Sequence, residues 1–123
     1  MSRLAGKVAI CTGAGRRSGL GFAILERLAR EGCNVVVSDL GTPDRFLGAD
    51  NIGATDEMRA VTEELAGLGV EALAVPCDVR RDPDVKKLMD ATMERFGRID
   101  ILVNNAGVGY MLKPFLENTV DEW

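Results

Sequence analysis

A glycine-rich stretch near the N-terminus has the residue types needed to hold a phosphate group. Residues 12–21 read TGAGRRSGLG, between a short apolar run and a helical pattern. Glycines let the backbone approach a pyrophosphate closely, and the first turn of the next helix offers unpaired N–H groups with a partial positive charge. A glycine-rich turn alone can also serve only to reverse the chain. The candidate phosphate contacts are Gly13, Gly15, Ser18, Gly19, Leu20 and Gly21.

A carboxylate follows this loop near the spacing used by dinucleotide-binding units. Asp39 lies 18 residues after Gly21, at the end of the apolar run 34–39. A carboxylate there accepts hydrogen bonds from both ribose hydroxyls and would repel a 2′-phosphate. In isolation, such an aspartate could merely end a strand. Its position relative to the glycine loop favours NAD as the cofactor over NADP.

Short β-branched runs alternate with longer segments of helical spacing, and these elements must position the two features. Strands are expected at residues 7–12, 34–39, 71–75 and 99–104. The alternation predicts an α/β fold, namely the first half of a Rossmann-type doubly wound parallel sheet with strand order 3-2-1-4. One domain is expected over residues 1–123, incomplete at its C-terminus.

The helices between these strands carry recognisable start and stop residues. The first helix should end at Gly32, the second should be capped by Thr55, and the third should have Asp82 as its N-cap before Pro83. Residues 41–54 contain three glycines and a proline, so a long surface loop is expected there.

Residues 97–107 read GRIDILVNNAG, and this run resembles the strand-four signature of the short-chain dehydrogenase/reductase family. Residues 77–79, CDV, are similar to the end of that family's third strand, and residues 6–9 to its first strand. The resemblance therefore covers nearly the whole chain. It implies that the NNAG element supports the central sheet and borders the adenosine half of the cofactor, and that residues 78 and 79 meet the adenine. The site residues implied in this way are Asp78, Val79, Asn105, Ala106 and Gly107.

The phosphate loop departs from the family pattern in length. The family has three residues between its TG pair and its GxG, whereas five separate Gly13 from Gly19 here. The added residues lie within 15–18, which leaves the donors to the pyrophosphate open. Arg16 and Arg17 lie in the same stretch, and NADP-preferring relatives often carry a basic residue there. Solvated surface charge is the alternative for both arginines, and Asp39 keeps the prediction on NAD.

The resemblance implies hydride transfer between nicotinamide and an alcohol or carbonyl substrate, with a serine, a tyrosine and a lysine four residues later as catalytic groups. The only tyrosine is Tyr110, and Lys113 lies three residues after it. We predict that Tyr110 lines the substrate or cofactor side without being catalytic, and that no residue of this chain is catalytic. The catalytic half is expected to be absent, and the capping box of residues 119–122, TVDE, announces a helix at the point where the chain stops.

Two other function classes remain as alternatives. The chain could be a non-catalytic nucleotide-binding module, or it could belong to another Rossmann-like class such as the adenosylmethionine-dependent methyltransferases. The NNAG element argues against the methyltransferases. The resemblance also implies a homo-oligomeric parent protein. Because strand four would form an apolar sheet edge, we expect the chain on its own to aggregate or to form a non-native dimer.

Composition excludes several further classes of function. A formal net charge of −4, without a dense run of lysine or arginine, argues against a nucleic-acid partner. The longest apolar runs are about strand length, so no membrane segment is expected. The three cysteines lack metal-ligand spacing and the chain has no histidine, so we expect no metal site, free thiols and a cytoplasmic location.

Overall fold

The β-branched runs form a parallel sheet at the centre of the molecule. The computed structural model describes residues 2–42, 55–107 and 113–122. Their four strands have the order β3-β2-β1-β4, which confirms the predicted fold class and topology. Ile10 of β1 is in register with Val36 of β2 on one side and Leu102 of β4 on the other. The strands are β1 (Val8–Cys11), β2 (Asn34–Asp39), β3 (Ala72–Pro76) and β4 (Ile101–Val103).

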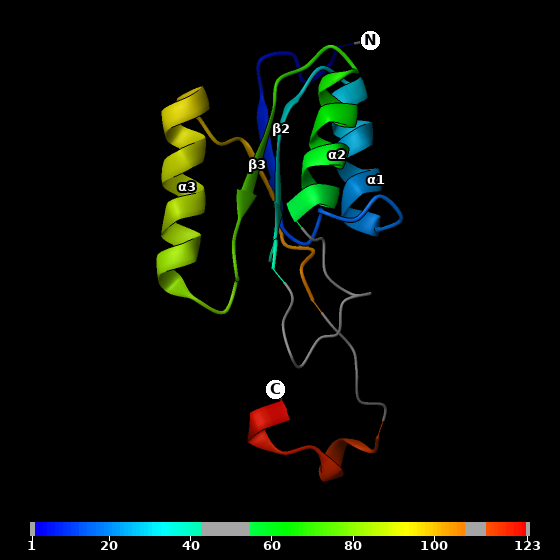
Figure 1. Ribbon diagram of the computed structural model, residues 1–123, viewed down its shortest axis with the longest axis vertical. Helices are drawn as coiled ribbons and strands as arrows, with labels where there is room; N and C mark the ends of the chain where they lie inside the picture. Colours follow the sequence, from blue (N-terminus) through cyan, green and yellow to red (C-terminus); the bar gives the residue numbers. More distant parts are fainter. Residues whose placement is uncertain (1, 43–54, 108–112, 123) are drawn as a thin grey trace.

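Helices cover both faces of the sheet, as the parallel connections require. Helices α1 (Leu20–Arg30) and α2 (Thr55–Ala66) lie on one face, and α3 (Asp82–Phe96) lies on the other (Figure 1). Two short 3-10 turns follow, η2 (Phe115–Glu117) and η3 (Val120–Glu122). The capping box at 119–122 thus coincides with a 3-10 turn in the described residues.

The core has two parts because the side chains of a strand alternate between the two faces of the sheet. Ala9 and Cys11 pack with α1 and α2, whereas Val8 and Ile10 pack with α3. All four residues of β1 are at most 1% exposed. The central strand is therefore apolar throughout and carries no chemistry itself. It positions the loop that leaves its carboxyl end.

Strands β1, β3 and β4 begin and end one or two residues away from the sequence-based expectations, and the difference is largest at β4. Strand β4 covers only three residues instead of 99–104. The Asp100 side chain accepts a hydrogen bond from the Val8 N–H at 2.9 Å, so a side chain replaces a strand carbonyl at the start of β4. At its other end, the Asn105 N–H bonds back to the Val103 carbonyl and turns the chain away from the sheet.

The predicted N-cap of the third helix was also wrong. Arg81, not Asp82, is the N-cap of α3, because its backbone is extended and its carbonyl accepts from the Asp84 and Val85 N–H groups. Thr55, the predicted cap of the second helix, is the first residue of α2, and its hydroxyl donates to the Gly41 carbonyl. Gly32 follows the end of α1 with φ +92°, and Gly97 ends α3 with a left-handed backbone at φ +73°. Most of the predicted surface loop, residues 43–54, lies outside the described residues.

Candidate functional site

The carboxyl ends of the parallel strands bring the candidate residues to one edge of the sheet. The glycine loop leaves β1, Asp39 ends β2, Asp78 follows β3 and Asn105 follows β4. In open α/β sheets this edge is where ligands bind. The sequence-based prediction that these four segments lie near one another therefore follows from the observed topology.

Asn105 and Thr12 join the glycine loop to the end of β4. The Asn105 side-chain amide donates to the backbone carbonyls of Thr12 at 3.0 Å and Gly13 at 3.2 Å. In return, the Thr12 hydroxyl oxygen accepts from the backbone N–H groups of Asn105 at 3.2 Å and Ala106 at 3.0 Å. These four bonds fix the start of the loop against the NNAG element, in agreement with the structural role that the resemblance implies.

Two glycines of the loop are required by this close approach. Gly13 has φ +66°, and a Cβ there would lie 2.8 Å from the Ala106 Cα. At Gly21 a Cβ would lie 2.7 Å from the side-chain nitrogen of Asn105 and 3.0 Å from the Ala14 Cα. Both positions exclude any larger residue, because the contacts are with backbone or with a hydrogen-bonded amide.

Asp39 connects the end of β2 to the same loop. Its carboxylate accepts hydrogen bonds from the Gly15 N–H at 3.0 Å and the Leu40 N–H at 2.8 Å, one on each oxygen. The residue is 9% exposed. Since an ionised carboxylate has about four acceptor positions, each oxygen can accept a further bond from a ligand hydroxyl. A Cβ at Gly15 would collide with Met58 of α2 and with Asp39 itself, so this loop position is as constrained as Gly13.

The start of helix α1 is free of side-chain caps. Gly19 is the N-cap, it makes no side-chain cap bond, and the first turn carries no acidic residue. The first N–H groups of a helix have no partner within it. An anion at this end would therefore meet unpaired donors and the positive end of the helix dipole. Ser18 and Leu20, on either side of the cap, are exposed, and Leu20 is 71% exposed.

The residues added to the loop form a turn that is tied to α2. The Gly19 N–H bonds to the Arg16 carbonyl at 3.0 Å. The Arg17 backbone N–H donates to a Glu57 carboxylate oxygen at 2.9 Å, and the Arg17 Nε donates to the Glu64 carboxylate at 2.8 and 3.0 Å. Arg17 is exposed and ion-paired with α2, so it is a surface charge with a defined partner.

The end of β3 carries the residues expected near the adenine. Asp78 forms a two-pronged ion pair with Arg80, with N–O distances of 2.9 and 2.7 Å, and also accepts the Arg80 backbone N–H at 3.0 Å. These hydrogen bonds lower the pKa of the Asp78 carboxyl below its usual value. Val79 is 47% exposed. The Cys77 N–H bonds to the Asp39 carbonyl at 2.8 Å, which joins this segment to the end of β2.

The three cysteines are buried free thiols. Burial, followed by the charge of Asp39, raises the pKa of Cys11 to about 11. Burial also raises the pKa values of Cys33 and Cys77. Thiols in this state are inert neutral groups. Within residues 2–42, 55–107 and 113–122, no group of three or more histidine, cysteine or acidic side chains is arranged to hold a metal ion, and no helix has the length and apolarity to cross a bilayer.

The structure therefore brings some of the predicted site residues into direct contact, whereas the others lie further from these contacts. Direct contacts or hydrogen bonds link Gly13, Gly15, Gly21, Asp39, Asn105 and Ala106. Gly107 is exposed, and Tyr110 lies outside the described residues.

Sequence reasoning missed the roles of Thr12, Arg17 and Arg80. The position of Thr12, directly before Gly13 at the end of a buried strand, was the available signal for an anchoring hydroxyl. No comparable signal exists for the Arg17 pairs, because its partners lie 40 and 47 residues away in the chain.

A protein family and individual known proteins are similar to this chain over most of its length. The family model described as short chain dehydrogenase matches residues 7–123. The D-beta-hydroxybutyrate dehydrogenase of Rhizobium meliloti (strain 1021) is 37% identical over 118 residues, which is 95% of this chain and 40% of that protein. The chain thus spans about two fifths of the length of this relative.

Two solved structures are also similar to this chain over nearly its whole length. The carveol dehydrogenase of Mycobacterium avium, in complex with NAD, superposes with a TM-score of 0.87 and 30% identity over 100% of this chain and 43% of that chain. A short chain dehydrogenase from Mycobacterium paratuberculosis bound to NAD gives a TM-score of 0.82 and 27% identity, covering 98% of this chain and 43% of that chain.

Proposed function

Because this chain belongs to the short-chain dehydrogenase family, we propose that it is the NAD(H)-binding part of an oxidoreductase acting on a small alcohol or carbonyl substrate. The observation that carries the proposal is the convergence of an uncapped helix N-terminus, the glycine loop and the Asp39 carboxylate at one edge of the sheet. That combination suits a ligand with a pyrophosphate and a ribose. The NAD complexes of two structural relatives support the same choice of cofactor.

The residues of the chain fit NAD(H) on three structural grounds. The glycines at 13, 15 and 21 let the loop pack closely against Ala106, Asp39 and Asn105 at the edge of the sheet. The first turn of α1 offers donors that no side chain caps. Asp39 keeps acceptor capacity on both oxygens after its two backbone bonds. The proposed contacts of the adenosine half are Asp39 for the ribose, Asp78 and Val79 for the adenine, and the NNAG element beside them.

The bound nicotinamide would supply hydride transfer, and the protein would supply binding and orientation. In this chain, Asn105 and Thr12 hold the start of the phosphate loop rigidly against β4. A preformed loop reduces the ordering cost of binding a flexible dinucleotide. Proton transfer is assigned to no residue of this chain. The contacts described here therefore determine cofactor affinity and orientation.

The choice of NAD over NADP follows in the proposal from the charge on Asp39. This carboxylate is buried beside the glycine loop, with the Gly15 N–H only 3.0 Å away. A 2′-phosphate on the ribose would bring about 1.5 to 2 negative charges next to it. Both groups would then lose water while facing a like charge, which disfavours NADP.

The test is Asp39→Asn, measured by calorimetric titration of the purified protein with NAD and with NADP. Asparagine keeps an acceptor for the Gly15 N–H and removes the charge. We expect the ratio of NAD affinity to NADP affinity to fall roughly tenfold to a hundredfold. Asp56→Asn is the matched control, since Asp56 is an exposed carboxylate in the first turn of α2. An unchanged ratio in Asp39→Asn would remove the basis for this cofactor assignment.

A non-catalytic nucleotide-binding module is the second candidate, because the serine, tyrosine and lysine set of the family is not present in the pattern of this chain. Alcohol oxidation followed by NADH absorbance separates the two candidates. The protein assayed should carry this chain together with any coding sequence that follows Trp123. A serine and a Tyr-x-x-x-Lys motif in that sequence, with turnover, supports the oxidoreductase. NAD binding without turnover of any alcohol or carbonyl tested supports the module.

A further inference from the structure

The structure assigns a second determinant of cofactor choice to Arg17, Glu57 and Glu64, which we call the Arg17 latch. We infer that Glu57 fixes the Arg17 backbone and Glu64 holds its side chain away from the cofactor edge, so that this loop cation is withheld from a 2′-phosphate. This inference rests on the proposed function and deepens it, because it concerns the specificity of the same site.

The latch contacts Arg17 at three points. Glu57 accepts the Arg17 backbone N–H at 2.9 Å. Both carboxylate oxygens of Glu64 accept from the Arg17 Nε, at 2.8 and 3.0 Å. The guanidinium also lies over the ring of Phe22, 4.3 Å from its centroid, and Phe22 is itself only 1% exposed. The backbone and the charged end of Arg17 are therefore both fixed, one by each glutamate.

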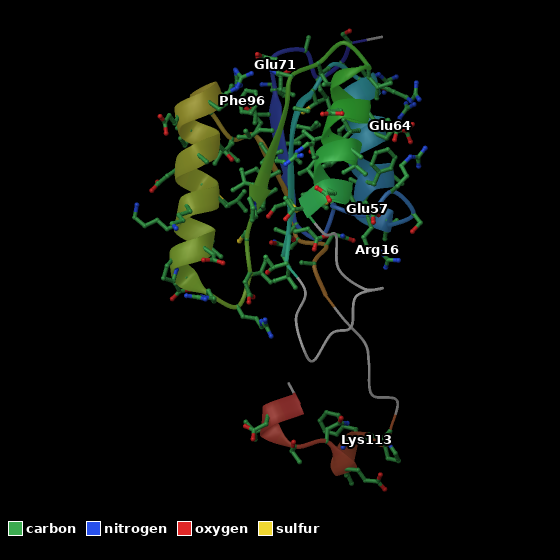
Figure 2. All side chains as sticks on the ribbon, viewed as in Figure 1. Arg16, Glu57, Glu64, Glu71, Phe96 and Lys113 are labelled. Carbon is green, nitrogen blue, oxygen red and sulfur yellow. The ribbon has the colours of Figure 1, made fainter. Side chains whose placement is uncertain are left out.

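The direction of α2 shows where the guanidinium is held. Helix α2 begins at the carboxyl edge of the sheet and runs back toward the start of β3 (Figure 1), with Glu57 near its start and Glu64 further along (Figure 2). Glu57 lies in its first turn, and Glu64 lies seven residues further along, about 10 Å at 1.5 Å per residue. The Arg17 backbone thus stays at the cofactor edge while its guanidinium is drawn along the helix, away from that edge.

Without the latch, Arg17 would be within reach of the site. It is two residues after Gly15, whose N–H bonds to Asp39, so the two Cα atoms of Arg17 and Gly15 are at most about 7 Å apart. An extended arginine side chain spans a similar distance. A guanidinium forms short, two-pronged hydrogen bonds to phosphate and remains charged at any ordinary pH. A released Arg17 would therefore favour a 2′-phosphate.

We expect the latch to have a modest effect on cofactor affinity, because its ion pair is exposed. The side chains of Arg17 and Glu64 are 59% and 46% exposed, so solvent weakens their ion pair. A 2′-phosphate could compete with a single exposed carboxylate. The Phe22 ring also holds the guanidinium and Glu57 holds the Arg17 backbone, which shifts that competition against the phosphate, and both glutamates repel the phosphate directly. Loss of both glutamates should then change NADP affinity more than NAD affinity.

The experiment measures NAD and NADP affinities by calorimetry for the wild-type protein and for the Glu57→Gln/Glu64→Gln variant. We expect the ratio of NADP affinity to NAD affinity to rise roughly threefold to tenfold in the variant, the range for gaining one exposed charge-assisted contact. A ratio is used because any general loosening of the fold alters both affinities together. Asp56→Asn/Glu63→Gln is the control, since it removes two negative charges from exposed positions of α2 next to Glu57 and Glu64.

A third variant separates release of the arginine from removal of negative charge. When Arg17→Gln is already present, adding Glu57→Gln and Glu64→Gln should leave the ratio of NADP affinity to NAD affinity unchanged within twofold. A rise that persists without Arg17, or an equal rise in Asp56→Asn/Glu63→Gln, would overturn the latch in favour of general electrostatics. NAD binding by the wild type with no change of ratio in Glu57→Gln/Glu64→Gln would overturn the latch alone. Failure of the wild type to bind either nucleotide would overturn the proposed function and the latch with it.

Discussion

Asn105→Ala is the substitution that most directly tests how the phosphate loop is supported. The Asn105 side-chain amide donates to the carbonyls of Thr12 and Gly13, and alanine would leave both of these acceptors without it. The Asn105 backbone N–H bond to the Thr12 hydroxyl would remain. The substitution therefore removes one side of the junction between loop and β4 while keeping the other.

The expected cost follows from the two lost bonds. A hydrogen bond contributes about 0.5 to 1.5 kcal/mol to stability, so two contribute about 2 kcal/mol. The site is only partly buried, and water can reach the freed carbonyls, which keeps the cost near this figure. For a chain of this size, about 4 °C per kcal/mol gives a fall in Tm of roughly 8 °C. NAD affinity should fall as well, because the loop then has to be ordered on binding.

Thermal unfolding followed by circular dichroism provides the measurement, and Asn118→Ala provides the control. The Asn118 amide also donates to two backbone carbonyls, those of Pro114 and Phe115, but its partners are local and exposed. That variant should lose less than about 0.5 kcal/mol. If Asn105→Ala and Asn118→Ala lower Tm equally, the junction between the loop and β4 does not have the structural role argued here.

Three further predictions concern the loop, the end of β3 and the buried thiols. Gly13→Ala should lower the free energy of unfolding by about 2 to 4 kcal/mol in urea titrations, since it adds backbone strain and a steric overlap, whereas Gly69→Ala, at φ +92° with open space around it, should cost only the strain. Arg80→Ala should raise the pKa of Asp78 toward its usual value in carbon-13 NMR titrations. In the wild type, the lowered pKa of Asp78 gives a small stabilisation that is present above the unfolded-state pKa of this residue and is lost as pH falls through its folded-state pKa, and the variant should lack this stabilisation. The Cys11 thiol, with its pKa raised to about 11, should resist alkylation at pH 8 until the protein is unfolded, and its contribution to stability should be lost as pH rises from about 8.5 toward 11. Alkylation of Cys11 in the folded protein at the rate of a free thiol, or an unmoved Asp78 titration, would contradict the respective prediction.

The strand order and the edge that carries the site were predictable from sequence because they follow from local patterns. Residues 35–37 are three consecutive valines, and β2 has the predicted bounds 34–39 in the structure. Alternation of strands and helices then leaves few possible topologies. The location of Asp39 beside the glycine loop follows from this topology, since parallel strands share a carboxyl edge.

The details that sequence could not supply depend on contacts between distant residues. The late start of the predicted fourth strand arises from the bond between the Asp100 side chain and the Val8 N–H, which are 92 residues apart. The N-cap of α3 shifted by one residue because Arg81 takes the extended conformation and its carbonyl receives the first helical bonds. The pairing of Arg17 with α2 also joins segments that no local pattern relates. Such contacts are tertiary, and propensity does not encode them.

Titration of the isotopically labelled protein with NAD, followed by two-dimensional amide NMR, tests the central claim most directly. The proposed site predicts that the amide signals of Gly15, Gly19, Gly21 and Asn105 shift together with a single Kd, while signals from the solvent-facing side of α3 stay in place. Adenosylmethionine at the same concentration should leave the spectrum unchanged. Shifts produced by adenosylmethionine and not by NAD, or NAD shifts confined to α3, would contradict the account.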